Sequence, residues 1–297
     1  RDTTQPTEQQ SAVSDAFIVA QEARGWLVQA AVAQSIAQRQ AVNGKSIDAA
    51  IRFEELRRKR VELSARLNEL YGVAEGDVGD LDKLKRDLVQ LQYSIEQAGV
   101  ELRTQAPRYA ELAQPRPLDI SSVLPLLRPD EALIAFYTLG DRVQVWLLRS
   151  GEPVVYREAQ VPQANLVNLV EKVRASIAPP QGTNSERPVA VAYDVEAAAE
   201  LYQLLFSSLA QHLANVSQLF LAPDEVLFPL PFAALLTERS SKQFGYFAQI
   251  FRQGRVPSMR DLADYAGLPW FVKSYTSTVL PSISVLKMLR QNVTAIQ

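Results

Sequence analysis

The chain has 297 residues, 47% of them hydrophobic, and a formal net charge of −2. This size suits one large or two ordinary globular domains, and the near-neutral charge gives no reason to expect a nucleic-acid partner. The absence of cysteine excludes disulfides, thiolate nucleophiles and cysteine-based metal sites, and the single histidine, His212, excludes a multi-histidine metal site.

The first part of the chain is predicted to be helical. Residues 1–13 are polar and are expected to form a flexible lead-in, and a helical region is expected over 14–106. Its first helix should begin near Asp15, with Ser14 as N-cap, and stop at Asn43 and Gly44.

An antiparallel helical hairpin is predicted within this region, at residues 46–103. Its second arm carries apolar residues in 3-4-3-4 steps, which is the spacing of a coiled-coil seam: Leu81, Leu84, Leu88, Leu91 and Ile95. The first arm carries a basic cluster at 57–60. An anionic partner would explain this cluster, but a solvated helix face paired with Glu54 and Glu55 explains it more simply.

A proline-rich linker is expected at 107–120, followed by a mixed α/β domain at 121–297. The order predicted there begins with three antiparallel strands at 131–137, 142–148 and 153–158, and continues with helices at 162–177 and 195–213. The expected fold class is therefore α/β, with an N-terminal helical hairpin or bundle followed by an incomplete sheet flanked by helices.

The second half of this domain centres on residues 219–236. A buried strand, a turn at 222–225, a second short apolar run and a helix initiated by Pro229 and Pro231 are predicted here. An insert is expected at about 237–268, then a strand at 271–276 and a last helix from Pro281.

Few residues are candidates for chemistry. His212 could act as a general base only beside a nucleophile, and the chain has no G-x-S-x-G motif, so a surface or helix-end histidine is the simpler interpretation. A serine-dependent hydrolase that uses His212 remains a third alternative. There is also no P-loop and no G-x-G-x-x-G motif.

Two segments with acidic residues are candidate sites. Asp224 and Glu225 are adjacent carboxylates in a turn, which usually serve turn formation and solvation. Tyr193 and Asp194 are expected to follow a strand at 189–192, a reasonable place for a site in an α/β sheet. We assign no catalytic, cofactor-binding or metal-binding residue from these patterns.

The segment 242–260 mixes aromatic and basic residues. This composition is typical of binding loops, but it is also typical of an amphipathic insert that packs its rings on the host domain. The residues concerned are Lys242, Phe244, Tyr246, Phe247, Phe251, Arg252, Arg255 and Arg260.

Several segments in order resemble the CHAT domain family, whose caspase-like domains often follow tetratricopeptide-type helices in bacterial proteins. The segments are Leu221-Ala222-Pro223-Asp224 with Leu230-Pro231-Phe232-Ala233-Ala234-Leu235, preceded by 127–134 and 143–146 and followed by 274–286. The resemblance covers about 15–290 and implies an α/β sheet sandwiched by helices, in a clan of cysteine peptidases.

The resemblance also implies a catalytic His and Cys downstream of the serine-led helix at Ser282. Neither has a counterpart: the sequence has no Cys and ends at Gln297, and His212 precedes the region where the family's His is expected. The expected function is the non-catalytic N-terminal portion of a cysteine peptidase of this family. The alternative is an inactive interaction module with no peptidase half.

The expected partners are proteins. A sheet without its later strands exposes an edge, so we expect association with the remaining half of the domain, with another polypeptide or with a second copy. A nucleic-acid partner is not expected, because the net charge is near neutral. A membrane is not expected either, because the chain has no apolar run of transmembrane length and no signal-peptide pattern. The compartment, cytoplasm or periplasm, is left open.

Overall fold

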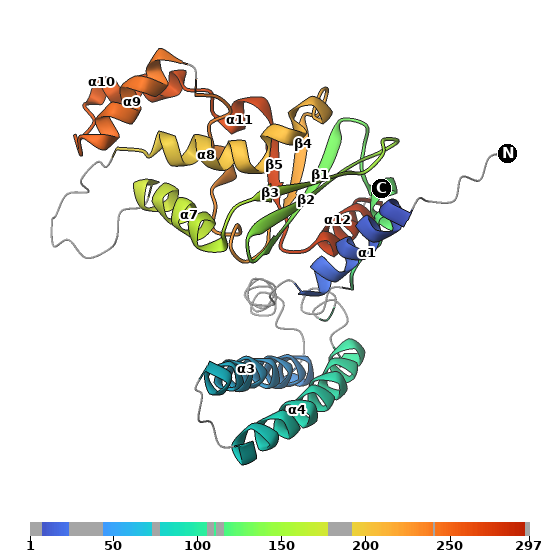
Figure 1. Ribbon diagram of the computed structural model, residues 1–297. Coiled ribbons are helices and arrows are strands. Elements are labelled where there is room, and N and C mark those ends of the chain that lie inside the picture. Colours follow the sequence, from blue (N-terminus) through green and yellow to red (C-terminus); the bar gives the residue numbers. More distant parts are fainter. Residues whose placement is uncertain are drawn as a thin grey trace. The chain divides into compact units, whose positions relative to one another are not determined.

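The structure is a computed structural model, and it describes residues 8–23, 44–72, 78–105, 110, 116–177, 192–239 and 241–294. The chain divides into two compact units (Figure 1). One unit consists of Arg1–Gly25 and Pro117–Gln297 and holds the sheet, and the other consists of Trp26–Arg116. The two units are described separately below.

The sheet has five strands in the order β3-β2-β1-β4-β5 (Figure 1). Its bounds are β1 Glu131–Leu139, β2 Arg142–Arg149, β3 Val155–Gln160, β4 Gln218–Ala222 and β5 Thr276–Val279. The first three strands form an antiparallel meander, whereas β1, β4 and β5 run parallel. This mixed sheet flanked by helices confirms the predicted fold class.

The central strand β1 is buried on both of its faces. Every residue from 131 to 136 is buried, as is typical of strands covered by helices on both sides of a sheet. Because successive side chains point to opposite faces, Ala132, Ile134 and Phe136 belong to one hydrophobic core, and Leu133 and Ala135 belong to the other. The sheet is therefore the middle of three layers.

Helices supply both outer layers. On the face of Ile134, the core is completed from α7 Gln163–Ile177, α8 Val195–Leu205, the 3-10 turns η2 Ser207–His212 and η3 Phe232–Ala234, α9 Lys242–Arg252 and α11 Phe271–Ser274. On the face of Leu133, it is completed from α1 Glu8–Ala23, α6 Ile120–Val123, the 3-10 turn η1 Leu124–Leu126 and α12 Ile283–Thr294. The remaining short helices are α10 Met259–Asp264 and η4 Tyr265–Gly267.

Helix α1 differs from its predicted start and from its predicted place. It begins at Glu8, so residues 8–13 are helical where a flexible lead-in was expected. It also packs on the sheet and belongs to the unit that holds the sheet. The Phe17 ring lies edge-on to Trp146 at 5.9 Å between centroids, and the Trp146 indole N–H donates to the carbonyl of Val13. The rest of the predicted first helix, at 24–43, lies outside the described residues.

The second unit contains the predicted hairpin, formed by α3 Gly44–Gly72 and α4 Val78–Gln105. The contacts of Arg52 with Glu101 and of Arg60 with Gln92 show that the helices run antiparallel. Their shared core is small and contains Ala49, Ala50, Phe53, Leu91, Ile95, Ala98 and Leu102. Most of the linker predicted at 107–120 lies outside the described residues.

The strand predicted at 271–276 is wrong in its position. Residues 271–274 form the short helix α11, and the strand β5 starts at Thr276. The Phe271 ring is buried against Phe206 at 5.0 Å between centroids, beside Tyr202. A single helical turn brings this ring into the core before the β-branched residues of β5 begin.

Two predicted helices are shorter than expected. The helix expected after Pro231 is the single 3-10 turn at 232–234, because Leu235 and Leu236 are extended and fully buried, and Leu236 bridges to Trp270. The helix predicted at 195–213 ends at Leu205, where Phe206 turns its ring into the core before η2.

The packing of α1 gives a direct stability prediction. Replacing Phe17, whose side chain is fully buried, by Ala should lower the free energy of unfolding of the sheet unit by about 3–5 kcal/mol. On the same helix, Val19→Ala removes a side chain that is 59% exposed and should change it by less than about 0.5 kcal/mol. Urea unfolding followed by Trp fluorescence measures both, and equal stabilities would contradict the docking of α1 on Trp146.

Candidate functional site

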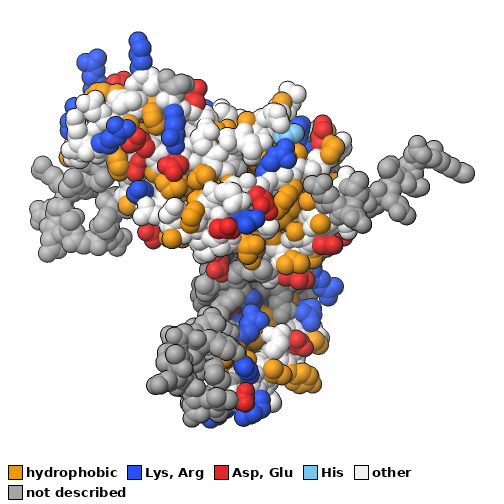
Figure 2. All heavy atoms as spheres, viewed as in Figure 1, with side chains coloured by type: hydrophobic (Ala, Val, Ile, Leu, Met, Phe, Trp, Pro, Cys, Tyr) orange, Lys and Arg blue, Asp and Glu red, His pale blue; other side chains and the backbone are white. Residues whose placement is uncertain are grey.

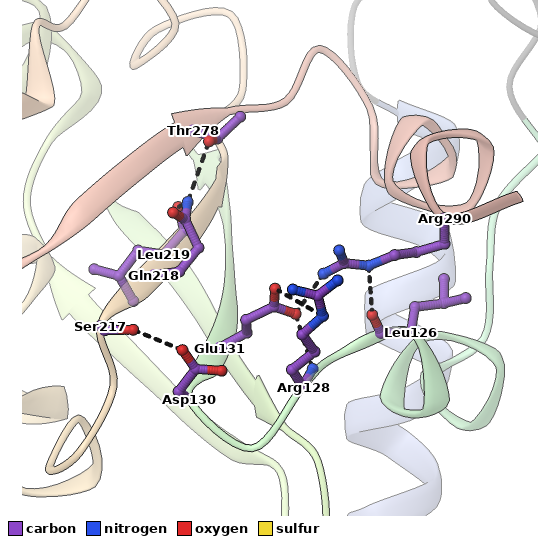
Figure 3. A network of polar contacts seen from close by, with 9 residues as sticks. All are labelled: Leu126, Arg128, Asp130, Glu131, Ser217, Gln218, Leu219, Thr278 and Arg290. Atoms are coloured by element: carbon purple, nitrogen blue, oxygen red, sulfur yellow. Dashed lines mark hydrogen bonds and ion pairs between the residues drawn. The ribbon is translucent and has the colours of Figure 1, made fainter. Parts of the chain in front are cut away.

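A polar network lies where β1, β4 and β5 begin, next to helix α12 (Figure 3). Its centre is Glu131, which is only 5% exposed although it carries a carboxylate. The Arg290 guanidinium forms an ion pair with Glu131 and donates to the carbonyl of Leu126 at 2.9 Å, and the backbone N–H of Arg128 donates to Glu131 at 2.8 Å. The network therefore compensates a buried charge and fastens α12 to the central strand.

The same end of the sheet fixes the register of the parallel strands. The Ser217 hydroxyl donates to the Asp130 carboxylate at 2.8 Å, and the Ser217 backbone N–H donates to the Asp130 carbonyl. The side-chain amide of Gln218 donates to the Thr278 hydroxyl at 3.1 Å across β4 and β5 (Figure 3). These contacts join strands that are far apart in the sequence, so the network is a structural clamp.

Strand β5 forms one edge of the sheet. Thr276 donates its backbone N–H to Ser217, and Leu280 donates to Leu221. In a parallel ladder, alternate residues bond to the same neighbour. The backbone N–H and C=O groups of Ser277 and Val279 therefore point away from β4, and no described residue pairs with them.

The two edges of the sheet differ in chemistry. Edge strand β3 carries exposed Arg157 and Glu158, and Glu158 also pairs with Arg142 at 3.1 Å. Such charges protect an edge against pairing with another chain. The β5 edge is Thr-Ser-Thr-Val, with no charge and no proline, and Val279 is 39% exposed. The β5 edge is therefore the candidate functional site, an interaction edge for a further strand.

At the opposite end of the parallel strands, Asp224 is a turn residue. Its carboxylate is buried and accepts the backbone N–H groups of Thr138 and Leu227, while its carbonyl accepts that of Phe228. These bonds link the end of β1 to the turn after β4. Glu225 is exposed, so the structure does not bring the two carboxylates into one site.

Tyr193 and Asp194 also have structural roles. Asp194 is the N-cap of α8 and accepts the backbone N–H of Ala197 at 3.0 Å. The Tyr193 hydroxyl donates to the carbonyl of Ala234 at 2.6 Å, and burial raises the pKa of this phenol well above its usual value. The strand predicted at 189–192 lies mostly outside the described residues.

The insert at 237–268 packs on the domain. Phe244 and Phe247 are buried, and Phe247 stacks on Tyr265 at 3.9 Å between centroids. Arg252 donates to Glu196 of α8 at 2.8 Å through its Nε. Most of the aromatic and basic residues singled out in the segment 242–260 therefore belong to an insert that packs its rings on the host domain.

One further polar cluster stabilises the insert. The Tyr246 hydroxyl donates to Asp261 at 2.6 Å and accepts from Arg255 at 2.9 Å. The bond from Tyr246, together with the backbone and hydroxyl of Ser258, lowers the pKa of Asp261 to about 2. Lys242 and Arg260 are exposed.

His212 ends the 3-10 turn at 207–212, as a helix-end residue. Its carbonyl accepts a hydrogen bond from Arg149 at 2.9 Å, and its ring lies 3.1 Å from the amide of Gln211. Within the described part of the chain, the only hydrogen-bond partner of the ring is this amide, so no serine nucleophile adjoins it. The basic cluster of α3 is partly engaged on the hairpin, where Arg57 lies over Phe53 and Arg60 donates to Gln92.

Neither a metal site nor a membrane span is found among the described residues. Among the described residues, no group of three or more His, Cys, Asp or Glu side chains could hold a metal ion. No helix in the described ranges is both long and apolar enough to cross a membrane.

Sequence reasoning expected an exposed sheet edge but did not place it at β5, and it did not find the Glu131–Arg290 pair. The signal for the pair was a glutamate at the start of an apolar strand, since a buried carboxylate requires a partner. Arg290 is 159 positions away, and no local pattern joins the two residues.

The pair gives a second prediction. Arg290→Ala leaves the buried Glu131 carboxylate with only Arg128 as a charge-stabilising partner within this network, and it should cost about 3 kcal/mol of unfolding free energy. Arg128→Ala is the control: its side chain is 67% exposed and lies 4.0 Å from Glu131, and the variant keeps the backbone N–H, so it should cost less than about 1 kcal/mol.

A double variant separates the lost charge partner from lost packing. Glu131→Gln combined with Arg290→Met removes both charges, and it should be more stable than Arg290→Ala alone. Chemical denaturation of all three variants provides the comparison. A double variant less stable than Arg290→Ala would show that the buried charge is not the origin of the effect.

Comparison with known proteins gives one family match. The model of the CHAT domain family matches residues 195–291, about a third of the chain, which run from α8 through β4 and β5 into α12. No curated protein and no solved structure matches the chain. The match does not include the N-terminal helices, so the predicted tetratricopeptide-type character is not confirmed. For the part of the sheet unit that holds the β5 edge, the match points to a caspase-like family.

Proposed function

We propose that this chain is the non-catalytic portion of a CHAT-type, caspase-like cysteine peptidase. It acts as a scaffold that binds the catalytic half of the domain along β5 and receives a partner protein through its helices. The β5 edge is the observation that carries this proposal: the outward backbone groups of Ser277 and Val279 pair with no described residue, the strand lacks protective charges, and it lies within the matched residues 195–291.

The chemistry of the chain supports a scaffold more than an enzyme. The 297 residues include no Cys, so they cannot supply the thiolate that a cysteine peptidase needs. His212 bonds through its ring to Gln211. A catalytic His and Cys would therefore come from the polypeptide that adds its strands beside β5.

Strand addition explains how such a half would bind. Main-chain hydrogen bonds provide affinity in this mode, and they need donors and acceptors that point outward at alternate positions. Ser277 and Val279 have this orientation, whereas Thr276 uses its N–H within the sheet. The edge can therefore pair with a strand without disturbing the β4–β5 ladder.

A proline variant tests the edge because it removes a single outward donor. Val279→Pro should keep the fold, since edge prolines are tolerated where the N–H faces solvent, but it should weaken binding of the catalytic half by at least about tenfold. Val279→Thr retains the N–H and should bind like the wild type. Thr276→Pro removes the donor to Ser217 and should lower stability, which checks the orientation of the ladder.

The probe is a recombinant polypeptide that carries the His–Cys strands of a CHAT-type peptidase from the same genome. Titration calorimetry gives its affinity for each variant, and a peptide-cleavage assay on the mixture reports assembly of the site. Cleavage that requires both polypeptides and falls with Val279→Pro supports the proposal. An inactive mixture, or equal binding by Val279→Pro, would overturn it.

An inactive interaction module is the second candidate, favoured by the lack of Cys in the sequence. The same titration distinguishes the two. A module without a peptidase half would not bind the His–Cys polypeptide, and the reading frame after Gln297 would encode no His-Gly and Cys following apolar strands.

A further inference from the structure

Helix α4 carries a second apolar stripe on the face opposite its hairpin core. The core side contains Leu84, Leu91, Ile95 and Leu102. Tyr93 lies nine residues after Leu84, which is about two and a half turns of helix, so it points the opposite way. Val89, Tyr93 and Val100 on this far face are 72%, 62% and 58% exposed.

Surface helices normally carry charged and polar residues on the face away from their core. Large apolar side chains spaced at i, i+4 and i+11 on that face are typical of a helix that packs against a second neighbour. In Figure 2, hydrophobic side chains lie at the surface of the unit that holds α3 and α4, between acidic and basic ones. The three residues Val89, Tyr93 and Val100 are called the outer stripe below.

The surface is hollowed on either side of Tyr93. One hollow, of about 590 Å³, is lined by Lys85, Arg86, Val89, Gln90 and Tyr93. The other, of about 530 Å³, is lined by Arg52 of α3 and, on α4, by Tyr93, Glu96, Gln97, Ala98, Val100 and Glu101. Tyr93 therefore stands between two depressions that each could receive side chains of an opposing helix.

The charges along the outer stripe are self-complementary. Lys85 and Arg86 are basic and lie at one end, and Glu96 and Glu101 are acidic and lie toward the other. If a second α4 packs antiparallel with Tyr93 opposite Tyr93, then residue 86 lies within one residue of the level of residue 101 of the other copy. At about 100° per residue, Arg86 and Glu101 lie on the same side of Tyr93, so opposite charges meet at both ends, as an isologous twofold contact requires.

We propose that a second copy of this chain covers the outer stripe, forming an antiparallel dimer of α4 helices centred on Tyr93. From residue 85 to residue 101 the contact is about 24 Å long. A contact of one helix face is below the usual size of a permanent interface, so the dimer should be reversible. Glu101 also contacts Arg52 at 3.6 Å within its own chain, an exposed pair that can coexist with the intermolecular one.

Sedimentation velocity of the full chain from about 1 to 100 μM tests the proposal, because a helix-face contact should dissociate within this range. The wild type should shift from monomer to dimer. Tyr93→Arg places two like charges at the symmetry centre and should abolish the dimer, whereas Asp87→Asn, an exposed change elsewhere on α4, should not. A wild type that stays monomeric throughout would overturn the proposal.

Charge reversal tests the antiparallel pairing directly. A chain with Lys85→Glu and Arg86→Glu should fail to dimerise, and so should a chain with Glu96→Lys and Glu101→Lys. An equimolar mixture of the two should form heterodimers at least about tenfold more tightly than either variant associates with itself. Lys85, Arg86 and Glu96 are exposed and Glu101 is half-buried, and circular dichroism confirms folding. A mixture that stays monomeric would contradict the antiparallel pairing.

The β5 edge is a competing route to self-association, and the same experiment separates it. The dimer should persist in Val279→Pro and vanish in Tyr93→Arg. Loss of the dimer in Val279→Pro would assign it to the sheet edge and overturn the α4 contact. Neither result depends on whether the His–Cys polypeptide binds, so this proposal and the proposed function can fail independently.

Discussion

The burial of β1 on both faces is the constraint on which the sheet unit depends. A strand with apolar side chains in both directions is stable only when two layers cover it, and the chain supplies those layers from distant segments. Helices after the strand cover Ile134 and Phe136, while α1, more than a hundred residues earlier, helps to cover the other face. The N-terminal helix therefore belongs to the sheet unit, where it packs on the Trp146 ring and accepts the hydrogen bond of its indole N–H.

The same burial creates a local electrostatic problem at Glu131. A carboxylate at the start of an apolar strand loses its hydration, and this desolvation costs several kilocalories per mole of folding free energy unless a partner compensates the charge. Arg290 and the backbone N–H of Arg128 provide that compensation. The requirement also positions α12, since the guanidinium reaches Glu131 only when the helix lies against the beginning of the parallel strands.

Sequence reasoning succeeded where the determining interactions are local. Alternating and continuous apolar runs located β1 and β2 closely, and the 3-4 spacing located the second arm of the hairpin. It failed where distant contacts decide: the ring of Phe271 is drawn into a core built from Phe206 and Tyr202, so the segment predicted as a strand forms a helical turn.

The candidate site shows the same division. The residue types that attract attention in a sequence, such as His212 and Asp224, serve helix ends and turns. The β5 edge is made of ordinary Thr, Ser and Val residues, which become unusual only through their place in the sheet. Edge position is a property of strand order, and strand order is fixed by contacts between distant segments, so a local pattern could not identify it.

Both proposed interaction surfaces are independent of the cores beneath them. Ser277 and Val279 direct their backbone groups away from the ladder, and Val89, Tyr93 and Val100 lie on the side of α4 opposite its buried residues. Substitution at these positions removes little that stabilises the fold. Their composition is therefore not required by folding, which is consistent with the proposals that a partner pairs with the neutral strand edge and that a second copy covers the apolar stripe.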